Sequence, residues 1–295
     1  MIVIFTNLDG ILFDQDDSCL EAAQPALDLL KDLNVPLILC SGKTRAETEF
    51  WRERLGNRHP FIVENGGAVF IPNGYFYTRL QVPCRKDNYD VFEFGEPYLH
   101  LVEVLQVASQ ESQCRVLGFH QMSVEEVSQR CGISRERAAL AKRREYDEPF
   151  EILGPGTRRL LRSIQKRQKR WTHFSRFFHI MGKNDKAHCV AQLMHFYQRF
   201  SREVLTVGFG DTLTDVRFLN QVDFPILMKS PAVSRLQREV PFGCVSEHAG
   251  PEGWNAAVLS ILGANARLVG HSWFGGLGAE TGGITLKGTG AVSRD

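Results

Sequence analysis

The chain has 295 residues, of which 43% are hydrophobic and 23% are charged, and its formal net charge at pH 7 is +1. This composition is typical of a globular enzyme, and the small net charge excludes a global field that would attract nucleic acid or anionic lipid. Seven cysteines without a Cys-x-x-Cys pair argue against a disulfide framework and favour a reducing, cytoplasmic location. No apolar stretch approaches the roughly 18 residues of a membrane span, so any anion is expected to bind at a local site.

Strand and helix patterns alternate in the first part of the chain. Residues 2–5, 36–40 and 61–63 are short apolar runs, typical of strands buried on both faces. Helical periodicity covers residues 21–33 and 46–55 between them. This alternation predicts parallel strand–helix–strand units, which bind ligands beyond the carboxyl ends of their strands.

The alternation stops after residue 81 and resumes after residue 172, with strand patterns at 204–207 and 225–228. We therefore predict an α/β fold, with a Rossmann-like parallel-sheet core, helices on both faces and an inserted α+β cap domain. The predicted domains are a discontinuous core at 1–81 and 173–263, a cap at 82–172, and a Gly-rich, poorly ordered tail at 264–295.

Four short segments place polar side chains at the ends of predicted strands and helices. They are Asn7 and Asp9 after the first strand, Ser41 after the second, Lys186 at the start of a helix, and Asp211 and Asp215 after the strand at 204–207. Carboxylates supply the oxygen ligands that Mg²⁺ prefers, and they can also serve as general acid and base. A hydroxyl and an ammonium group neutralise phosphoryl oxygens. The combination predicts phosphoryl transfer.

In order and spacing these segments resemble the four motifs of the haloacid dehalogenase superfamily, with a cap between the second and the third. The resemblance implies that the residue at position 7 attacks phosphorus, giving an acyl-phosphate that water then hydrolyses. It also implies that Asp9 is the acid and base and that Ser41 and Lys186 hold the phosphate. Mg²⁺ would be bound by position 7, Asp9 and Asp211, with support from Asp215.

Segments at 144–150, 178–182, 228–231 and 250–254 resemble the mannosyl-3-phosphoglycerate phosphatases, and the similarity extends over most of residues 1–262. This resemblance implies hydrolysis of mannosyl-3-phosphoglycerate to mannosylglycerate, a compatible solute. The implied partner is a small phosphorylated sugar or glycerate, with no nucleic acid and no membrane. Its phosphate and carboxylate would be bound by cationic side chains. The candidates are Lys43, Lys142, Arg144, His179 and Lys183.

Asn7 departs from the superfamily pattern, because an Asp nucleophile is expected at its position. A carboxamide oxygen is a poor nucleophile and brings no negative charge to a metal ion. An engineered substrate trap, natural divergence and partial deamidation all remain open, although Ile11 and Thr214, which also depart from the pattern, favour divergence. We hypothesise that the chain hydrolyses phosphate esters very slowly or not at all.

Two alternative functions follow from the same residues. One is a phosphatase for another sugar phosphate, of the sucrose-phosphate kind, and the other is a catalytically inactive phosphosugar-binding protein. The basic run at 158–170 could indicate nucleic-acid binding, but no aromatic residue interrupts it before Trp171. It is therefore interpreted as a solvated helix face.

Overall fold

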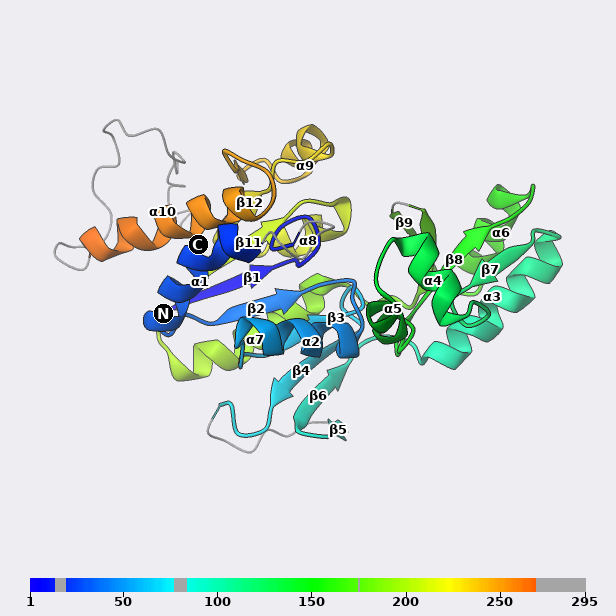
Figure 1. Ribbon diagram of the computed structural model, residues 1–295, viewed down its shortest axis with the longest axis horizontal. Helices are drawn as coiled ribbons and strands as arrows, with labels where there is room; N and C mark the ends of the chain where they lie inside the picture. Colours follow the sequence, from blue (N-terminus) through cyan, green and yellow to red (C-terminus); the bar gives the residue numbers. More distant parts are fainter. Residues whose placement is uncertain (14–19, 77–83, 175, 269–295) are drawn as a thin grey trace, which may run out of the picture.

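The computed structural model describes residues 1–13, 20–76, 84–174 and 176–268. Two sheets organise these residues, one of nine strands and one of four. Figure 1 shows the nine-stranded sheet with its helices as the larger body, and the green segment that contains the four-stranded sheet beside it. The predicted α/β class is therefore confirmed.

The larger sheet has the strand order β13-β12-β11-β1-β2-β3-β4-β6-β5. Pairing is parallel from β13 to β3 and antiparallel from β3 to β5. Runs of β-branched and aromatic residues explain why the central strands are buried on both faces. The strands are β1 (Ile2–Thr6), β2 (Leu37–Cys40), β3 (Phe61–Val63), β4 (Ala68–Pro72), β5 (Cys84–Lys86), β6 (Tyr89–Glu93), β11 (Leu205–Gly210), β12 (Phe224–Leu227) and β13 (Cys244–Val245).

Helices cover both faces of this sheet, as the sequence predicts. One face packs against α1 (Leu20–Asp32), α2 (Arg45–Leu55) and α10 (Gly250–Leu268), around a core that includes Trp51 and Trp254. The other face packs against α7 (Lys186–Phe200), α8 (Val216–Leu219) and α9 (Val233–Glu239). Alternate residues of each central strand enter the two cores, which follows from the two-residue period of a strand. A short 3₁₀ turn, η2 (Leu213–Asp215), precedes α8.

The smaller sheet is antiparallel and has the order β7-β8-β10-β9. Its strands are β7 (Val116–Gly118), β8 (Asp147–Ile152), β9 (Arg170–Phe174) and β10 (Phe177–Met181). Helices α3 (Tyr98–Ser112) and α6 (Thr157–Lys166) pack on one face and form a separate apolar core. Helices α4 (Val124–Cys131) and α5 (Arg135–Ala141) form a further small cluster. This unit has its own core, as an inserted domain requires.

The strand pairings move both boundaries of the inserted unit away from 82 and 172. Strands β5 and β6 belong to the core sheet, because β6 pairs with β4. Strand β10 belongs to the smaller sheet, because it pairs with β8 and β9. The inserted unit therefore runs from the start of α3 to the end of β10. Loss of the strand–helix alternation marks the change from parallel to antiparallel pairing, which occurs before the domain boundary.

The predicted C-terminal tail, 264–295, begins within α10, since that helix continues to Leu268. Residues 269–295 lie outside the described part of the chain. Within the described ranges, no helix combines the length and the apolar character that crossing a bilayer takes.

Candidate active site

The register of the central strands brings the first, second and fourth motifs together. Thr6 at the end of β1 pairs with Phe209 of β11 on one side and with Leu39 of β2 on the other. The three parallel strands therefore end at the same edge of the sheet. The residues that follow them, including Asn7, Ser41 and Asp211, are placed at that edge, where open α/β sheets bind ligands.

Asn7 is buried and lies against the carboxylate of Asp211. Its amide Nδ2 donates to Asp211 Oδ1 at 3.4 Å, and its Oδ1 accepts from the Leu8 amide at 2.9 Å. Gly10 has φ +72°, and a Cβ atom at this position would lie 2.7 Å from Asp211 Oδ2. The loop after β1 therefore approaches the Asp211 carboxylate so closely that only glycine fits at position 10.

Asp211 lies in an environment that disfavours its charge. Burial and the neighbouring Asp215 raise the pKa of Asp211 to about 7, although Lys186 and the Asn7 amide act in the opposite direction. Burial and the neighbouring Asp215 charge both favour the binding of a cation at the Asp211 carboxylate.

Lys186 and Asp215 form a buried ion pair beside Asp211. The Lys186 Nζ lies 2.7 Å from Asp215 Oδ1, and both side chains are almost fully covered. Asp215 Oδ2 accepts from the amides of Asp211 and Thr212 and from the Thr212 hydroxyl. Protein donors therefore contact both oxygens of Asp215, so this residue holds Lys186 and the loop that carries Asp211.

Asp9 is the exposed acidic group of the site and pairs with Lys43. The distance from Lys43 Nζ to Asp9 Oδ1 is 2.8 Å, and half of the Asp9 side chain is accessible. Burial opposes the charge of Lys43, but Asp9 and Glu47 outweigh burial and hold its pKa above the usual value. Lys43 thus places a fixed positive charge next to Asp9.

Ser41 is fully buried at the end of β2, and its Oγ accepts from the Lys43 amide at 3.2 Å. Because the hydroxyl accepts here, its own proton can be donated to a ligand oxygen. Helix α2 starts just beyond, at a capping box formed by Thr44 and Glu47, which fixes the loop that carries Ser41.

A second polar cluster joins the smaller sheet to this loop. Arg144 donates from Nη1 to the Gly42 carbonyl at 3.0 Å, and its Nη2 lies 3.6 Å from Asp147. Asp147 in turn contacts His179 Nδ1 at 2.9 Å. Asn65, which follows β3, also hydrogen bonds to Asp147. Arg144 and His179 are therefore brought together next to the Ser41 loop.

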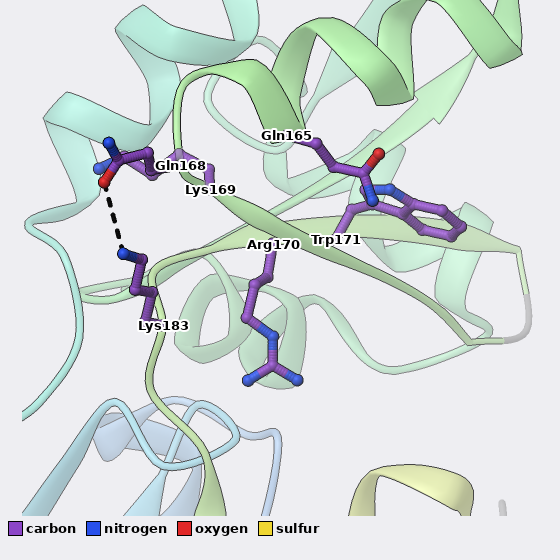
Figure 2. Close-up of a pocket in the computed structure, with 6 residues that line it drawn as sticks. All are labelled: Gln165, Gln168, Lys169, Arg170, Trp171 and Lys183. Carbon is purple, nitrogen blue, oxygen red and sulfur yellow. Dashed lines mark hydrogen bonds between the residues drawn. The ribbon is translucent and has the colours of Figure 1, made fainter.

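The remaining two predicted substrate-binding residues lie elsewhere. Lys142 donates from Nζ to the backbone carbonyls of Phe119 and Met122 inside the inserted unit. Its ammonium group is therefore bound within the inserted unit and is not directed to the Ser41 loop. Lys183 is exposed and lines a pocket with residues of the α6–β9 segment, which Figure 2 shows in close-up.

Sequence reasoning overlooked Asn65 and Asp147 as members of this cluster. The signal for Asn65 was its place at the carboxyl end of β3, before Gly66 and Gly67. Asp147 gave no such signal, because it opens a strand of the inserted unit and its neighbours are polar as well as apolar.

The chemistry of the donor set fits a hard divalent cation beside Asp211. Available oxygens are the Asp211 carboxylate and the Asn7 carboxamide, and oxygen ligands suit Mg²⁺ or a similar ion. Within the described residues, no group of three or more His, Cys, Asp or Glu side chains is arranged to hold a metal ion. A cation here would therefore depend on amide, carbonyl or water oxygens in addition to one carboxylate.

Known proteins resemble this chain over most of its length. Residues 4–91 match the family model of the haloacid dehalogenase-like hydrolases. The chain is 39% identical over 272 residues to a glucosyl-3-phosphoglycerate/mannosyl-3-phosphoglycerate phosphatase of Methanococcoides burtonii, covering 90% of this chain and 99% of that relative. It is 34% identical to the mannosyl-3-phosphoglycerate phosphatase of Pyrococcus furiosus, over 77% and 90% of the two chains.

Solved structures share the fold at low sequence identity. A haloacid dehalogenase-like hydrolase from Bacteroides thetaiotaomicron aligns with a TM-score of 0.60 at 12% identity, covering 88% of this chain and 98% of the other. A sugar phosphatase of haloacid dehalogenase subclass IIB aligns with a TM-score of 0.57 at 14% identity, covering 90% and 99%. Haloacid dehalogenase phosphatases are generally metal-dependent. The chain belongs to the haloacid dehalogenase-like hydrolases and, among these phosphoric monoester hydrolases, to the mannosyl-3-phosphoglycerate phosphatase family.

Proposed function

We propose that this chain binds mannosyl-3-phosphoglycerate with Mg²⁺ at the carboxyl ends of β1, β2 and β11, and that Asn7 makes its hydrolysis to mannosylglycerate very slow. The observation that carries the proposal is the position of Asn7. Its carboxamide Nδ2 lies 3.4 Å from Asp211 Oδ1, at the position where the family is expected to have its nucleophile. The names of the relatives support the choice of substrate.

Each retained residue has a role that its surroundings support. Ser41 and Lys186 neutralise and orient the phosphoryl oxygens. Asp9 is the accessible carboxyl that gives a proton to the leaving oxygen and later takes one from water. Asp215 acts through Lys186 and the Asp211 loop, because both of its oxygens already accept from protein groups.

The cation would be held by the Asp211 carboxylate, the Asn7 carboxamide oxygen and the Asp9 backbone carbonyl. When bound, Mg²⁺ supplies positive charge that screens the phosphate from the surrounding carboxylates. Replacing a nucleophilic carboxylate by an amide removes one negative ligand, so we expect weaker cation binding than in a chain with Asp at position 7.

Substrate groups beyond the phosphate would meet Arg144, His179 and Lys43, which lie around the Ser41 loop. Arginine recognises a carboxylate through two parallel hydrogen bonds, and the buried Arg144 Nε has no hydrogen-bond partner within the described residues. We therefore assign the glycerate carboxylate to Arg144. Lys142 is not part of this assignment, because its ammonium group is bound to carbonyls of the inserted unit.

Phosphate release by this chain and by its Asn7→Asp variant tests the proposal. With Mg²⁺ and mannosyl-3-phosphoglycerate, we expect the variant to be faster by about a thousandfold or more, because the nucleophile is restored. Asn7→Ser, which supplies neither a carboxylate nor the amide, should stay at the level of the starting chain. Equal turnover of the starting chain and its Asn7→Asp variant would contradict the proposal.

The alternative of a phosphosugar-binding protein makes a different prediction. If Asn7 serves binding alone, calorimetry should detect Mg²⁺-dependent binding of the phosphosugar, and Asn7→Asp should still release no phosphate. A panel that includes glucosyl-3-phosphoglycerate and sucrose phosphate would show whether another phosphosugar is preferred.

A further inference from the structure

A pocket of about 450 Å³ lies where α6 runs into β9, the edge strand of the smaller sheet. Its lining residues are Gln165, Gln168, Lys169, Arg170, Trp171 and Lys183. A second pocket of about 360 Å³ shares three of these residues and adds Phe94, Glu96, Lys166 and Arg167. Gln168, Lys169 and Lys183 line both, so the two pockets are neighbours, and we call them together the linker pocket.

The linker pocket is strongly basic in a chain whose net charge is only +1. Its walls contain five cationic side chains and a single carboxylate, that of Glu96. Glu96 is paired with Lys169 at 2.8 Å, and Arg167 is paired with Glu111, which does not line the pocket. The positive charge is therefore concentrated and only partly compensated, which favours an anionic occupant.

Three of the cations, Lys166, Arg170 and Lys183, are weakly engaged. Within the described residues, Lys183 forms one hydrogen bond, to Gln168 Oε1 at 3.4 Å, and Lys166 forms no ion pair. Arg170 donates to the Asn184 carbonyl at 3.3 Å and lies 3.9 Å from Asp185. These are long contacts that a carboxylate or phosphate could replace with shorter, charge-assisted ones.

The pocket also offers neutral hydrogen-bond donors beside an aromatic face. Figure 2 shows the Gln165 amide next to the Trp171 ring and the Lys183 side chain directed toward Gln168. Side-chain amides suit hydroxyl or carboxylate oxygens, and an indole face suits a small carbon skeleton.

We propose that the linker pocket is a second ligand site, which binds a small organic anion carrying a phosphate or carboxylate group. None of its lining residues is Asn7, Asp9, Ser41, Lys186 or Asp211, so the site uses groups other than those of the phosphoryl site. The volume of about 450 Å³ falls in the range of small-molecule sites.

A ligand in the linker pocket could affect the position of Lys186 through a short chain of contacts. Arg170 contacts the Asn184 carbonyl, and Asp185, the next residue, caps the start of α7. Lys186 is the first residue of that helix. A ligand that draws Arg170 and Lys183 toward itself would therefore act on the loop that positions Lys186.

Trp171 fluorescence tests the proposal directly. The full chain is titrated without Mg²⁺, at constant ionic strength, with inorganic phosphate, glycerate and 3-phosphoglycerate, and Trp171→Phe identifies the signal of this residue. We expect saturable binding of at least one of these anions, weakened by about tenfold or more in Lys183→Gln and in Arg170→Gln. Comparison of phosphate with glycerate shows which anionic group is recognised.

Two matched control variants distinguish binding in the linker pocket from a general charge effect and from binding at the phosphoryl site. Arg162→Gln removes an exposed cation of α6 that lines neither pocket, and Ser41→Ala alters the phosphoryl site; both should leave the Trp171 titration unchanged. No saturation up to roughly 10 mM, or an equal loss in Arg162→Gln, would overturn the proposal. A loss in Ser41→Ala would also overturn it, since the titration would then report the phosphoryl site. The readout is binding and does not depend on hydrolysis.

Discussion

The ion pair of Lys186 with Asp215 is the most buried charged contact in the candidate active site. Burial disfavours the charge of Lys186, but Asp215 more than offsets it, so the pKa of the ammonium group stays above its usual value. A pair of this kind contributes little net stability as long as it is complete. Removing one partner, however, leaves the other as a buried charge without compensation, which is strongly destabilising.

Replacing Lys186 by Met should destabilise the fold by about 3–5 kcal/mol, because Asp215 is then left buried without its cation. Urea unfolding, followed by circular dichroism, measures the difference. Lys166→Met is the matched control: this lysine is exposed, and its replacement should change the unfolding free energy by about 0.5 kcal/mol or less. Equal effects of the two substitutions would show that the buried pair has no special role.

The position of an individual site residue was predictable where the residue lies at the end of a strand or at the start of a helix. Asn7, Ser41 and Lys186 follow strands or open a helix, so their position was encoded in the pattern of apolar residues. Lys142 was assigned to the substrate from its place in the chain, whereas its side chain turns to the carbonyls of Phe119 and Met122. Periodicity gives the face of a helix but not the direction of a long, flexible side chain near its end.

At the scale of elements, the turn between β3 and β4 contains two consecutive non-glycine residues with positive φ. Glu64 and Asn65 both have left-handed backbone conformations, with φ of 46° and 55°. Glu64 is fully buried, and its carboxyl oxygens accept from the amides of Glu145 and Tyr146 at 2.9 and 2.8 Å. A strained core turn thus holds a loop of the inserted unit.

Glu64 should make stability depend on pH. Burial raises its pKa from 4.5 to about 8, although Arg144 and the two amides act in the opposite direction. Between these two values the folded chain keeps a proton on Glu64 that the unfolded chain releases. The unfolding free energy should therefore fall as pH rises through this window. Glu64→Gln should remove this contribution to the fall in unfolding free energy. The contribution is on the order of a few kcal/mol between pH 4.5 and about 8.

Urea unfolding at several pH values from 5 to 8.5 checks this expectation. Asp211, whose pKa is also raised, contributes a fall of the same sign in both proteins, so the difference between the two curves is the relevant quantity. Glu103→Gln is the control, because Glu103 is exposed on α3. Parallel curves for the starting chain and Glu64→Gln would refute the role of Glu64.

Helices and parallel strands were the elements that the sequence predicted well. The helix expected at 46–55 is α2, which begins one residue earlier, and the strand at 61–63 is β3. Strands β5 and β6 were not recognised as core strands, because they are short, partly polar and joined by a tight turn at Asp87. Antiparallel edge strands carry a weaker pattern than strands buried on both faces.

On the scale of the whole molecule, Tyr146 is a buried side chain of the inserted unit that contacts the core. Its side chain is buried, and a Cβ atom on Gly67 or on Gly95 would lie within 2.6 Å of it. Its hydroxyl donates to Glu93 at 2.6 Å and accepts from Lys86 at 2.9 Å. One aromatic ring therefore packs against both the β3–β4 turn and the connection into α3.

Replacing Tyr146 by Ala should separate the unfolding of the two units. We expect two calorimetric transitions in place of one, and a loss of about 3–5 kcal/mol, because the ring fills a close-packed space at the junction. Tyr146→Phe keeps the ring and loses only the hydroxyl contacts, so it should retain a single transition. One unchanged transition in Tyr146→Ala would mean that other contacts couple the two units.

The position of β1 in the middle of the core sheet has a consequence for synthesis on the ribosome. One neighbour, β2, is translated soon afterwards, but Ile2 pairs on its other side with Leu205 of β11. At about 5–20 residues per second, roughly 10–40 seconds separate the two strands. During that time the inserted unit, which is continuous in the chain, can fold first. The edge of β1 that later pairs with β11 is still unpaired. A nascent chain that stalls within the insertion would keep this apolar edge open to aggregation or to chaperones.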